Sequence, residues 1–593
     1  MRDSLGNYIV DRTESLNELL IKEYFIDSND KKISRLLDAE QYLLLGSRGI
    51  GKTMLMKKAE IEATDTFEQN SILAVWVSFE ESLRIERIKI SDSTIDVDPF
   101  LQWTMGKILI EILKKIIELK PANIDFLSDK LATIFPNNET NIFPIDYYTK
   151  ILNNYLEILE TADIDNNTDL NKQAPSNELV KILDNPHSFK TFIIDIVSNF
   201  NLKRIILLFD EAAHVFSPSQ QEKFFTFFKS LRSDKIACKA AVYPGITTYG
   251  KSFERNQDAK EIKMNWSPQN PEDLLFIKKV IKKRLQSFDS TYWEKLNVQK
   301  DIIDTLCMCS NGNPRFAFHI LDELDNNNVF SKKSITKNDL INAIRKVVTT
   351  KWDEFITLSN RLVKFKIIIN EAENWLKNTI IPNMRNWNNN KRTQGKKLSS
   401  GFYLETSTYE KISDVLDILS YSNFIYVDES KKSIGHSRYG YYISINPALL
   451  FSDSVLKDSV EMYNTSTNID NNQNYSDTSE YVKPLLSVVT IISDENSCTN
   501  TKCDFITDDL SFTFCKKCGF KMEIKESTPL YKILRSHPID NLKLSLAIVT
   551  RLATKFSNIG ELYDAEIDTI RMPYIQDYRI MKIKDAVKEY MSG

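Results

Sequence analysis

Continuous apolar runs along the chain predict strands that are buried on both faces. Such runs lack the apolar and polar alternation of a half-exposed strand, and they are typical of the middle of a parallel sheet. The predicted strands lie at residues 43–45, 72–79, 205–209 and 239–250. With the helical patterns between them, they predict an α/β core with a parallel sheet over residues 1–270.

Helical apolar spacing dominates two regions next to these strands. Residues 97–200 are mostly helical in pattern and contain an Asn/Asp-rich stretch near 162–178. We therefore expect a large helical insert before the strand at 205–209. Residues 271–350 are also helical in pattern, and we expect them to form a helical lid on the core.

Residues 351–460 show a different order of patterns. An amphipathic helix at 351–380 precedes a polar stretch at 384–398, which we expect to be a loop. A helix, an apolar strand, a charged turn from Glu429 to Arg438 and an alternating Tyr/Ile strand follow. This order is typical of a winged helix, and a protein-packing module with a solvated charged hairpin remains the alternative. Basic residues that could contact phosphate there are Arg385, Lys391, Arg392, Lys396, Lys397, Lys431, Lys432 and Arg438.

The composition changes sharply in the last part of the chain, after residue 460. Residues 461–480 contain hardly any large aliphatic side chains and predict a disordered linker. Residues 481–527 contain a cluster of cysteines, and residues 528–593 have helical apolar spacing with short breaks. We expect two small domains here, the second of them α-helical.

Length and charge limit the possible classes of protein. A chain of 593 residues is too long for one hydrophobic core, so several domains are expected. The net charge of −4 excludes a uniformly basic nucleic-acid-binding surface, and any such binding must depend on local patches. No apolar run reaches ~18 residues and no signal-peptide core is present, which predicts a cytoplasmic protein without a membrane partner.

The strongest motif follows the first predicted strand. The sequence GSRGIGKT matches G-x-x-x-x-G-K-[ST], the loop whose backbone N–H groups surround phosphates before a helix N-terminus. Lys52 would reach the β- and γ-phosphates of ATP, and Thr53 would hold Mg²⁺. The expected nucleotide-binding residues are Gly46, Ser47, Arg48, Gly49, Ile50, Gly51, Lys52 and Thr53.

A pair of acids follows the apolar run at 205–209. Asp210 and Glu211 come at the carboxyl end of that predicted strand, which is where ligands bind in open α/β sheets. We expect Asp210 to orient the magnesium shell and Glu211 to polarise the attacking water. A solvated acidic turn is the alternative, but it becomes less attractive beside a complete phosphate-binding loop.

Strand–GSRGIGKT–helix, then LLFDEAAH, and then helices with GNPRFAFHIL resemble an AAA+ ATPase of the origin-recognition/initiator-like branch, including its bacterial members. The resemblance covers residues 1 to about 350 and implies that Arg315 contacts the γ-phosphate as the lid-helix arginine. It also makes Arg255 the candidate for an arginine acting on a neighbouring subunit, and places the first sensor near Thr247 or Thr248. A solvent-facing arginine is the alternative at Arg315 and at Arg255.

Four of the seven cysteines lie close together, at Cys498, Cys503, Cys515 and Cys518. Their spacing, Cys-x4-Cys followed by Cys-x2-Cys-Gly, resembles a zinc ribbon with one longer knuckle. Four thiolates can close a tetrahedral zinc site, and a segment this small lacks a core without a metal. The predicted cofactors are therefore ATP, Mg²⁺ and Zn²⁺.

The C-terminal segment, residues 528–593, resembles a degenerate helix-hairpin-helix. Its hairpin, Tyr574-Ile575-Gln576, lacks both glycines that usually present N–H groups to phosphate. Binding of the DNA backbone and a helical bundle for protein contact both remain open for this segment.

Together these features predict an ATP-hydrolysing switch that binds nucleic acid, with DNA favoured and mainly through its backbone. We expect ATP to assemble copies of the chain into a homo-oligomer. The resemblance to bacterial members further implies a role in antiviral defence. The alternative is a nucleotide-gated scaffold that recruits a separate effector protein without touching nucleic acid. A helicase is least favoured, because no second ATPase core and no strand-tracking motif series is present.

Overall fold

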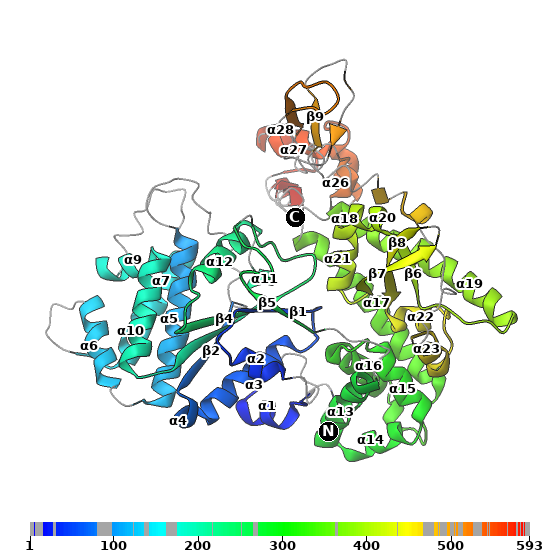
Figure 1. The fold of residues 1–593 in the computed structure, drawn as a ribbon. Helices are drawn as coiled ribbons and strands as arrows, with labels where there is room; N and C mark the ends of the chain where they lie inside the picture. Colours follow the sequence, from blue (N-terminus) through cyan, green and yellow to red (C-terminus); the bar gives the residue numbers. More distant parts are fainter. Residues whose placement is uncertain are drawn as a thin grey trace.

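The computed structural model of the chain describes most of the residues up to 466 and shorter segments beyond. The described residues are 5, 13, 16–27, 31–79, 98–121, 124–135, 142–161, 175–215, 218–250, 252–264, 271–361, 366–435, 437–466, and parts of 479–587. In Figure 1 the N-terminal core lies on the left, the following helices and a second sheet on the right, and the C-terminal elements at the top.

The N-terminal core contains a five-stranded parallel sheet in the order β2-β3-β4-β1-β5. The strands are β1 (Tyr42–Leu45), β2 (Ile72–Ser78), β3 (Arg204–Asp210), β4 (Ile236–Val242) and β5 (Lys260–Lys263). The first three strands lie where the apolar runs predict them. The predicted strand at 239–250 is wrong in its second half, because the chain turns after Val242 through Pro244 and Gly245, with φ of +73° at the glycine.

Helices cover both faces of this sheet, and the side chains of one strand divide between them. Ile206 and Leu208 of β3 pack with the face that carries α3 (Lys52–Asp65). Ile205, Leu207 and Phe209 pack with the face that carries the helical region 98–200 and α12 (Pro218–Ser230). Burial on both faces explains why β3 is a continuous apolar run in the sequence.

Helices fill the region that precedes β3. They are α5 (Pro99–Leu119), α6 (Ile124–Ile134), α7 (Ile145–Thr161), α9 (Asn177–Leu183) and α10 (Pro186–Asn199). Most of the Asn/Asp-rich stretch near 162–178 lies outside the described residues. Shorter helices elsewhere in the core are α1 (Glu18–Tyr24), α2 (Lys32–Leu36), α4 (Phe67–Asn70) and α11 (Ala212–Val215).

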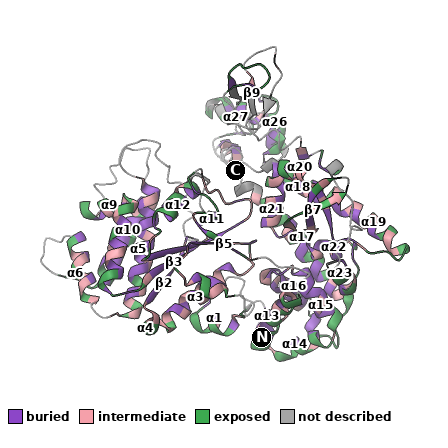
Figure 2. Cartoon of the chain, in the orientation of Figure 1, coloured by how far each residue is buried: buried purple, intermediate pink, exposed green. Residues whose placement is uncertain are grey.

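The helices after the core share one hydrophobic cluster with the second sheet. Figure 2 colours the buried positions of both in purple. The last of these helices, α17 (Lys337–Arg361), continues past residue 350 without a break. The regions predicted as separate, residues 271–350 and 351–460, are therefore packed as one unit. The elements are α13 (Pro271–Phe288), α14 (Ser290–Asn297), α15 (Lys300–Cys309), α16 (Pro314–Asn326), η5 (Val329–Ser331) and α17 (Lys337–Arg361).

A three-stranded antiparallel sheet of order β6-β8-β7 follows these helices. Two short helices lie between its first two strands in the chain. The elements are α18 (Lys366–Asn374), the π-helical turn η7 (Trp375–Ile380), α19 (Ile381–Thr393), β6 (Gly401–Glu405), α20 (Thr406–Lys411), α21 (Ser413–Tyr421), β7 (Ile425–Gly435), β8 (Arg438–Ile445) and α22 (Pro447–Ser452).

Two predictions for this region are wrong. The stretch 384–398 is not a loop throughout, because α19 extends to Thr393. The buried Asn388 stabilises it by accepting from Ser399 N and donating to Ser399 O, both at 2.8 Å. The charged segment that begins at Glu429 is also not a turn, because β7 continues to Gly435 and the hairpin turn is short.

The C-terminal part forms a small antiparallel sheet and a separate hydrophobic cluster. The first residues of the predicted linker are helical in α23 (Ser459–Ser466), a correction to that prediction, whereas residues 467–478 lie outside the described residues. The remaining elements are η8 (Ser479–Val482), β9 (Glu495–Cys498), β10 (Ile506–Thr507), β11 (Met522–Lys525), η9 (Ile539–Asn541), α26 (Leu546–Leu552), α27 (Ile559–Asp564) and α28 (Ile567–Ile570). Among the described helices, we find none with the length and apolar character to cross a membrane.

Candidate functional site

The loop between β1 and α3 lies at the carboxyl edge of the parallel sheet. Gly49 and Gly51 have φ of +83° and +99°, which a residue with a side chain rarely adopts. A Cβ at Gly49 would also lie only 2.8 Å from Oδ1 of Asn313, the N-cap of α16. Glycine therefore permits both the backbone conformation of the loop and the close approach of α16.

Lys52, at the start of α3, is buried beneath this loop. Its Nζ donates to the carbonyl oxygens of Gly46 at 2.7 Å and Ser47 at 3.0 Å, and lies 3.7 Å from the centre of the Tyr243 ring. Burial lowers the pKa of Lys52, while the nearby Glu211 and Asp210 carboxyl groups act in the opposite direction. The arrangement places a cation where its charge is poorly solvated and would be stabilised by an anionic ligand.

The two predicted acids end β3 and begin the following turn. Asp210 is buried, and its Oδ1 accepts from the Glu211 backbone N–H at 3.1 Å. Glu211 has a φ of +62°, an uncommon conformation for a residue other than glycine, and such outliers gather at functional sites. Burial and the neighbouring Asp210 raise the pKa of Glu211 to about 7, and the hydroxyl of Tyr243 donates to Glu211 Oε1 at 3.0 Å.

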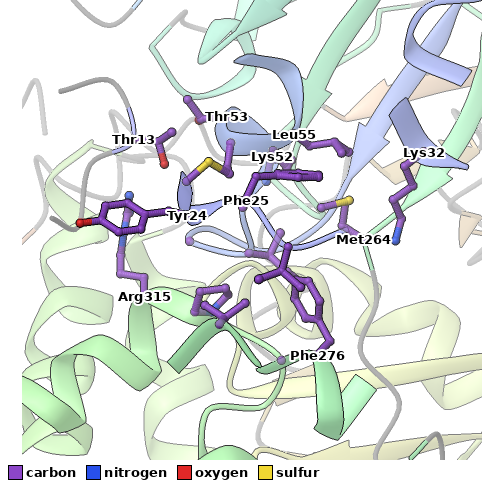
Figure 3. A pocket seen from close by; sticks show the side chains of 18 of the residues that line it. Thr13, Tyr24, Phe25, Lys32, Lys52, Thr53, Leu55, Met264, Phe276 and Arg315 are labelled. Carbon is purple, nitrogen blue, oxygen red and sulfur yellow. The ribbon is translucent and has the colours of Figure 1, made fainter. Parts of the chain in front are cut away.

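A cavity of about 520 Å³ opens beside these groups (Figure 3). In this view Tyr24 and Arg315 lie at the left of the cavity and Met264 and Phe276 toward the right. The predicted residues that line it are Arg48, Gly49, Ile50, Gly51, Lys52, Thr53, Glu211 and Arg315. Its apolar lining, including Phe25, Ile26, Met264, Leu275 and Phe276, suits the ring of a nucleobase.

The structure separates Arg255 from this cavity. Arg255 lies between β4 and β5, where its Nε donates to Glu261 Oε1 at 2.8 Å and its guanidinium lies 5.5 Å from the Tyr249 ring centre. It does not line the cavity within its own chain. A role for Arg255 toward a second copy of the chain stays a prediction.

Two residues that the sequence analysis missed lie at the cavity. Tyr243, the first residue after β4, contacts both Lys52 and Glu211, whereas Thr247 hydrogen-bonds the backbone N–H of Tyr243 at 2.9 Å. Arg284 of α13 also lines the cavity, and only 5% of it is exposed. The position of Tyr243 at a strand end could have signalled its importance, but nothing in the helical pattern of α13 distinguishes Arg284.

Arg284 is held mainly by aromatic rings. Its guanidinium lies 3.8 Å from the ring centre of Tyr24 and 5.3 Å from that of Phe318. Its Nη1 atom is buried and has no hydrogen-bond partner among the described residues. Burial lowers the pKa of Arg284 to about 10. Such a cation favours a ligand that brings hydrogen-bond acceptors into the cavity.

Helix α21 of the second sheet region reaches the same loop. The Arg48 backbone N–H donates to the carbonyl oxygen of Tyr421 at 3.3 Å, and the Tyr421 ring lies 5.5 Å from that of Tyr243 in an edge-on contact. Asp417 of α21 packs so closely on Gly245 that a Cβ there would lie 2.5 Å from the Asp417 Cβ. We call residues 46–51 the nucleotide loop, after their sequence motif. This loop thus contacts the β6-β8-β7 region directly.

The four C-terminal cysteines form a second candidate site. The Sγ atoms of Cys498 and Cys518 are 3.3 Å apart, those of Cys503 and Cys515 are 3.7 Å apart, and all four lie within 4.8 Å of one another. Four sulfurs at ~2.3 Å from one zinc ion would be about 3.8 Å apart, so the cluster is compatible with Zn²⁺. The Lys517 backbone N–H donates to Cys515 Sγ at 3.3 Å, as suits a metal-bound thiolate.

The parallel sheet and the loop at its edge define an α/β P-loop core. Residues 10–301, just under half of the chain, match the family model described as ORC-CDC6-like. Over these residues the chain is similar to that family. A search of the curated proteins gave no match.

Two solved structures from Aeropyrum pernix are similar over most of their length. The ORC2 protein, in ADPNP-ADP complexes, is 13% identical over 77% of this chain and 94% of its own, with a TM-score of 0.26. The ORC1 protein in complex with DNA is 8% identical over 76% of this chain and 96% of its own, with a TM-score of 0.28. With TM-scores this low, neither alignment bears on the domain arrangement of the present chain.

Proposed function

We propose that the chain is an ATP-binding and hydrolysing AAA+ switch that binds nucleic acid, with DNA favoured. The observation that carries this proposal is the meeting of Lys52, Glu211 and Arg315 at one cavity on the carboxyl edge of a parallel sheet. A lysine on a phosphate-binding loop, a carboxylate beside it and a lid arginine are the groups that ATP hydrolysis needs. The ORC-CDC6-like match to residues 10–301 is consistent with this role.

Each residue has a distinct task in this proposal. Lys52 leaves the Gly46 and Ser47 carbonyl oxygens and binds the phosphates, and the loop glycines let the backbone approach them. Thr53 and Asp210 would hold Mg²⁺, which would neutralise charge on the phosphates. Glu211 orients and polarises the attacking water, and Arg315 contacts the γ-phosphate.

The order β6-β8-β7, with α20 and α21 between β6 and β7 in the chain, supports the winged-helix interpretation of residues 351–460. Not all of its basic residues are suited to contact phosphate. Arg385 bonds Asp453 at 2.9 Å, and Arg392 bonds both carboxylate oxygens of Glu461 at 2.8 and 2.9 Å. Lys396, Lys397 and Lys431 are exposed and remain the better candidates.

The tail is a weaker candidate for backbone contact. Tyr574 has a φ of +76°, so the hairpin keeps a left-handed conformation at a residue where glycine is the usual occupant. The amino group of Lys584, however, bonds the carbonyl oxygens of Tyr563 and Ala565 and is occupied inside the fold. Assembly into a homo-oligomer, with Arg255 acting on a neighbouring copy, belongs to the same proposal.

A nucleotide-gated scaffold that recruits an effector protein is the second candidate. The observation that favours it is the placement of α21, which carries Asp414 and Asp417 and packs on the ATPase core instead of presenting a basic surface. The comparisons give no support to a role in antiviral defence, which stays an expectation from the resemblance alone.

The test compares nucleic-acid binding by the full chain and by a chain that lacks residues 495–593. The cut is placed there because Val482 and Leu485 pack in the main core and have to be kept. We expect the truncated chain to lose affinity while its basal ATP hydrolysis is unchanged. Affinity of the full chain should fall steeply with salt, with a log–log slope of about −0.9 per phosphate contacted on duplex DNA, and should differ between ATP and ADP. Failure of the full chain to bind at low salt would favour the scaffold.

A further inference from the structure

Two large aromatic side chains next to the four-cysteine site in the sequence are exposed. We call residues 514–521, with the sequence FCKKCGFK, the aromatic knuckle. The exposed fractions of Phe514 and Phe520 are 64% and 55%. Two exposed rings within eight residues make this segment a candidate interaction site.

The knuckle holds its rings by backbone bonds instead of by packing. The Cys515 N–H donates to the Phe520 carbonyl oxygen at 2.7 Å, and the Gly519 N–H donates to the Cys515 carbonyl oxygen at 2.8 Å. Phe514 and Lys521 form an antiparallel bridge pair across the turn. The two cysteines inside the knuckle belong to the four-sulfur cluster, so the segment is tied at its centre. Its rings are therefore preorganised for a ligand.

The charge of the knuckle has one sign. Lys516, Lys517 and Lys521 are exposed, and the segment contains no acidic residue. Because Phe514 and Lys521 are opposite each other on the bridge, a ring and an ammonium group can lie on the same side of it. Aromatic faces beside cations match a polymer with flat bases and a phosphate backbone.

We propose that the aromatic knuckle binds single-stranded nucleic acid, with bases stacked on Phe514 and Phe520 and phosphates contacted by its lysines. This inference rests on the proposed nucleic-acid-binding function and assigns it a site and a form of substrate. Single strands are favoured because the base faces of a duplex are covered by stacking, whereas an unpaired base exposes its π-face to a protruding ring. Any base can stack on an aromatic ring, so the site distinguishes single strands from duplexes and is insensitive to base sequence.

The test measures the affinity of the full-length protein for a labelled oligothymidine single strand and for a mixed-sequence duplex of equal length. We expect Phe514→Ala and Phe520→Ala each to weaken single-strand binding roughly tenfold, with a much smaller change for the duplex. Phe514→Trp and Phe520→Trp should restore single-strand affinity, because they keep a stacking face. Val298→Ala, at a residue with an exposed fraction of 84% on the far helical region, controls for loss of an exposed apolar group.

The zinc content of each variant shows whether the knuckle keeps its fold, and basal ATP hydrolysis shows whether the rest of the chain does. Wild-type single-strand affinity in the Phe514→Ala/Phe520→Ala double variant overturns this inference and leaves the proposed function standing. If leucine at both positions binds as well as tryptophan, the rings act as a general apolar contact, as for a protein partner, and the inference is again wrong. No binding of wild-type protein to either nucleic acid at low salt overturns the inference and the proposed function together.

Discussion

The nucleotide loop and the aromatic knuckle place their functional groups in opposite environments. Lys52 has an exposed fraction of only 4% and is enclosed by the loop, Tyr243 and the acids after β3. On the knuckle every lysine and both phenylalanines are exposed. The loop depends on contacts between segments hundreds of residues apart, such as that of Asn313 Nδ2 with the Arg48 carbonyl oxygen at 2.7 Å. The knuckle depends on bonds within eight residues and on four clustered thiols.

This difference suits the two kinds of ligand that we propose for these regions. Buried charges are costly until a ligand of opposite charge arrives, so the loop favours a specific, enclosed anion. Exposed rings and ammonium groups cost little and contact a long polymer without enclosing it. If the two regions fold independently, a variant of one should keep the fold and the basal activity of the other, and the predictions below test this separation. Coupling between the two regions then depends on their bound ligands.

The largest effect is expected for Lys52→Ala. It removes the only lysine of the loop, and with it charge-assisted bonds to the phosphates, so ATP affinity should fall by at least roughly 100-fold. Calorimetric titration with ATP measures this change. Lys58→Ala on the same helix, where Lys58 and Glu62 lie 3.9 Å apart, is the matched control and should bind ATP normally. The Lys52→Ala variant should retain its zinc. Unchanged ATP affinity in this variant would contradict a phosphate-binding role for the loop.

Glu211→Gln should leave ATP binding intact and reduce kcat by about 10²–10⁴-fold, because only the carboxylate that polarises water is lost. Since burial raises the pKa of Glu211 to about 7, the ionised form grows as pH rises, and the wild-type kcat/KM should increase through about pH 7. This increase of kcat/KM with pH should be absent in Glu211→Gln. Glu222→Gln, at an exposed position of α12, is the control. A Glu211→Gln enzyme with wild-type turnover would remove this residue from the mechanism.

Breaking the four-cysteine cluster should spare the loop. We expect about one zinc per chain in protein purified without chelator, and none in Cys515→Ser or Cys518→Ser. Basal ATP hydrolysis should be retained in both variants, while single-strand binding should decrease because the knuckle loses its anchor. Cys238→Ala, at a buried cysteine of β4, should keep its zinc. Elemental analysis that finds no zinc in the wild-type chain would leave the cluster without a metal role.

The smallest effect is expected where α21 meets the core. Burial raises the pKa of Asp417 to about 6, the neighbouring Asp414 adds to this, and Arg255 opposes it. Above the ordinary pKa of an aspartate, ionisation in the folded state costs stability, and the cost is complete above about pH 6. Asp417→Asn should therefore raise the free energy of unfolding by about 1–2 kcal/mol at pH 7. The gain should vanish as pH falls to about 4, as thermal unfolding at both pH values can show. Asp414→Asn, at an exposed position of the same helix, removes only the neighbouring charge and should give a smaller gain of the same sign.

The sequence predicts the loop and the acids because their signals are local. GSRGIGKT and the apolar run before Asp210 each fit within a dozen residues, and the structure brings Lys52 and Glu211 to one cavity. The role of Tyr243 and the contact of Tyr421 with the loop arise from packing between distant segments, which periodicity does not encode. The cysteine spacing likewise predicts the cluster, because all four residues lie within one short segment.

Helix α19 shows a failure of the opposite kind. Its Asn-rich sequence has low helix propensity and predicts a loop. Tertiary contacts override that preference, since Asn388 bonds Ser399 and Arg392 bonds Glu461. Arg385 bonds Asp453, so both arginines of the stretch that suggests a phosphate-binding loop have a structural role. The hairpin of β7 and β8 differs from the predicted charged turn for a related reason, because pairing with β8 extends the strand through the charged segment to Gly435.

The central proposal, an ATPase coupled to nucleic acid, is tested most directly by one rate. We would measure steady-state ATP hydrolysis by the full chain at low salt, alone, with a single-stranded oligonucleotide and with a duplex. We expect a basal rate that depends on Glu211 and that changes on addition of nucleic acid, with the single strand acting through the aromatic knuckle. A measurable rate that is the same under all three conditions would contradict the coupling.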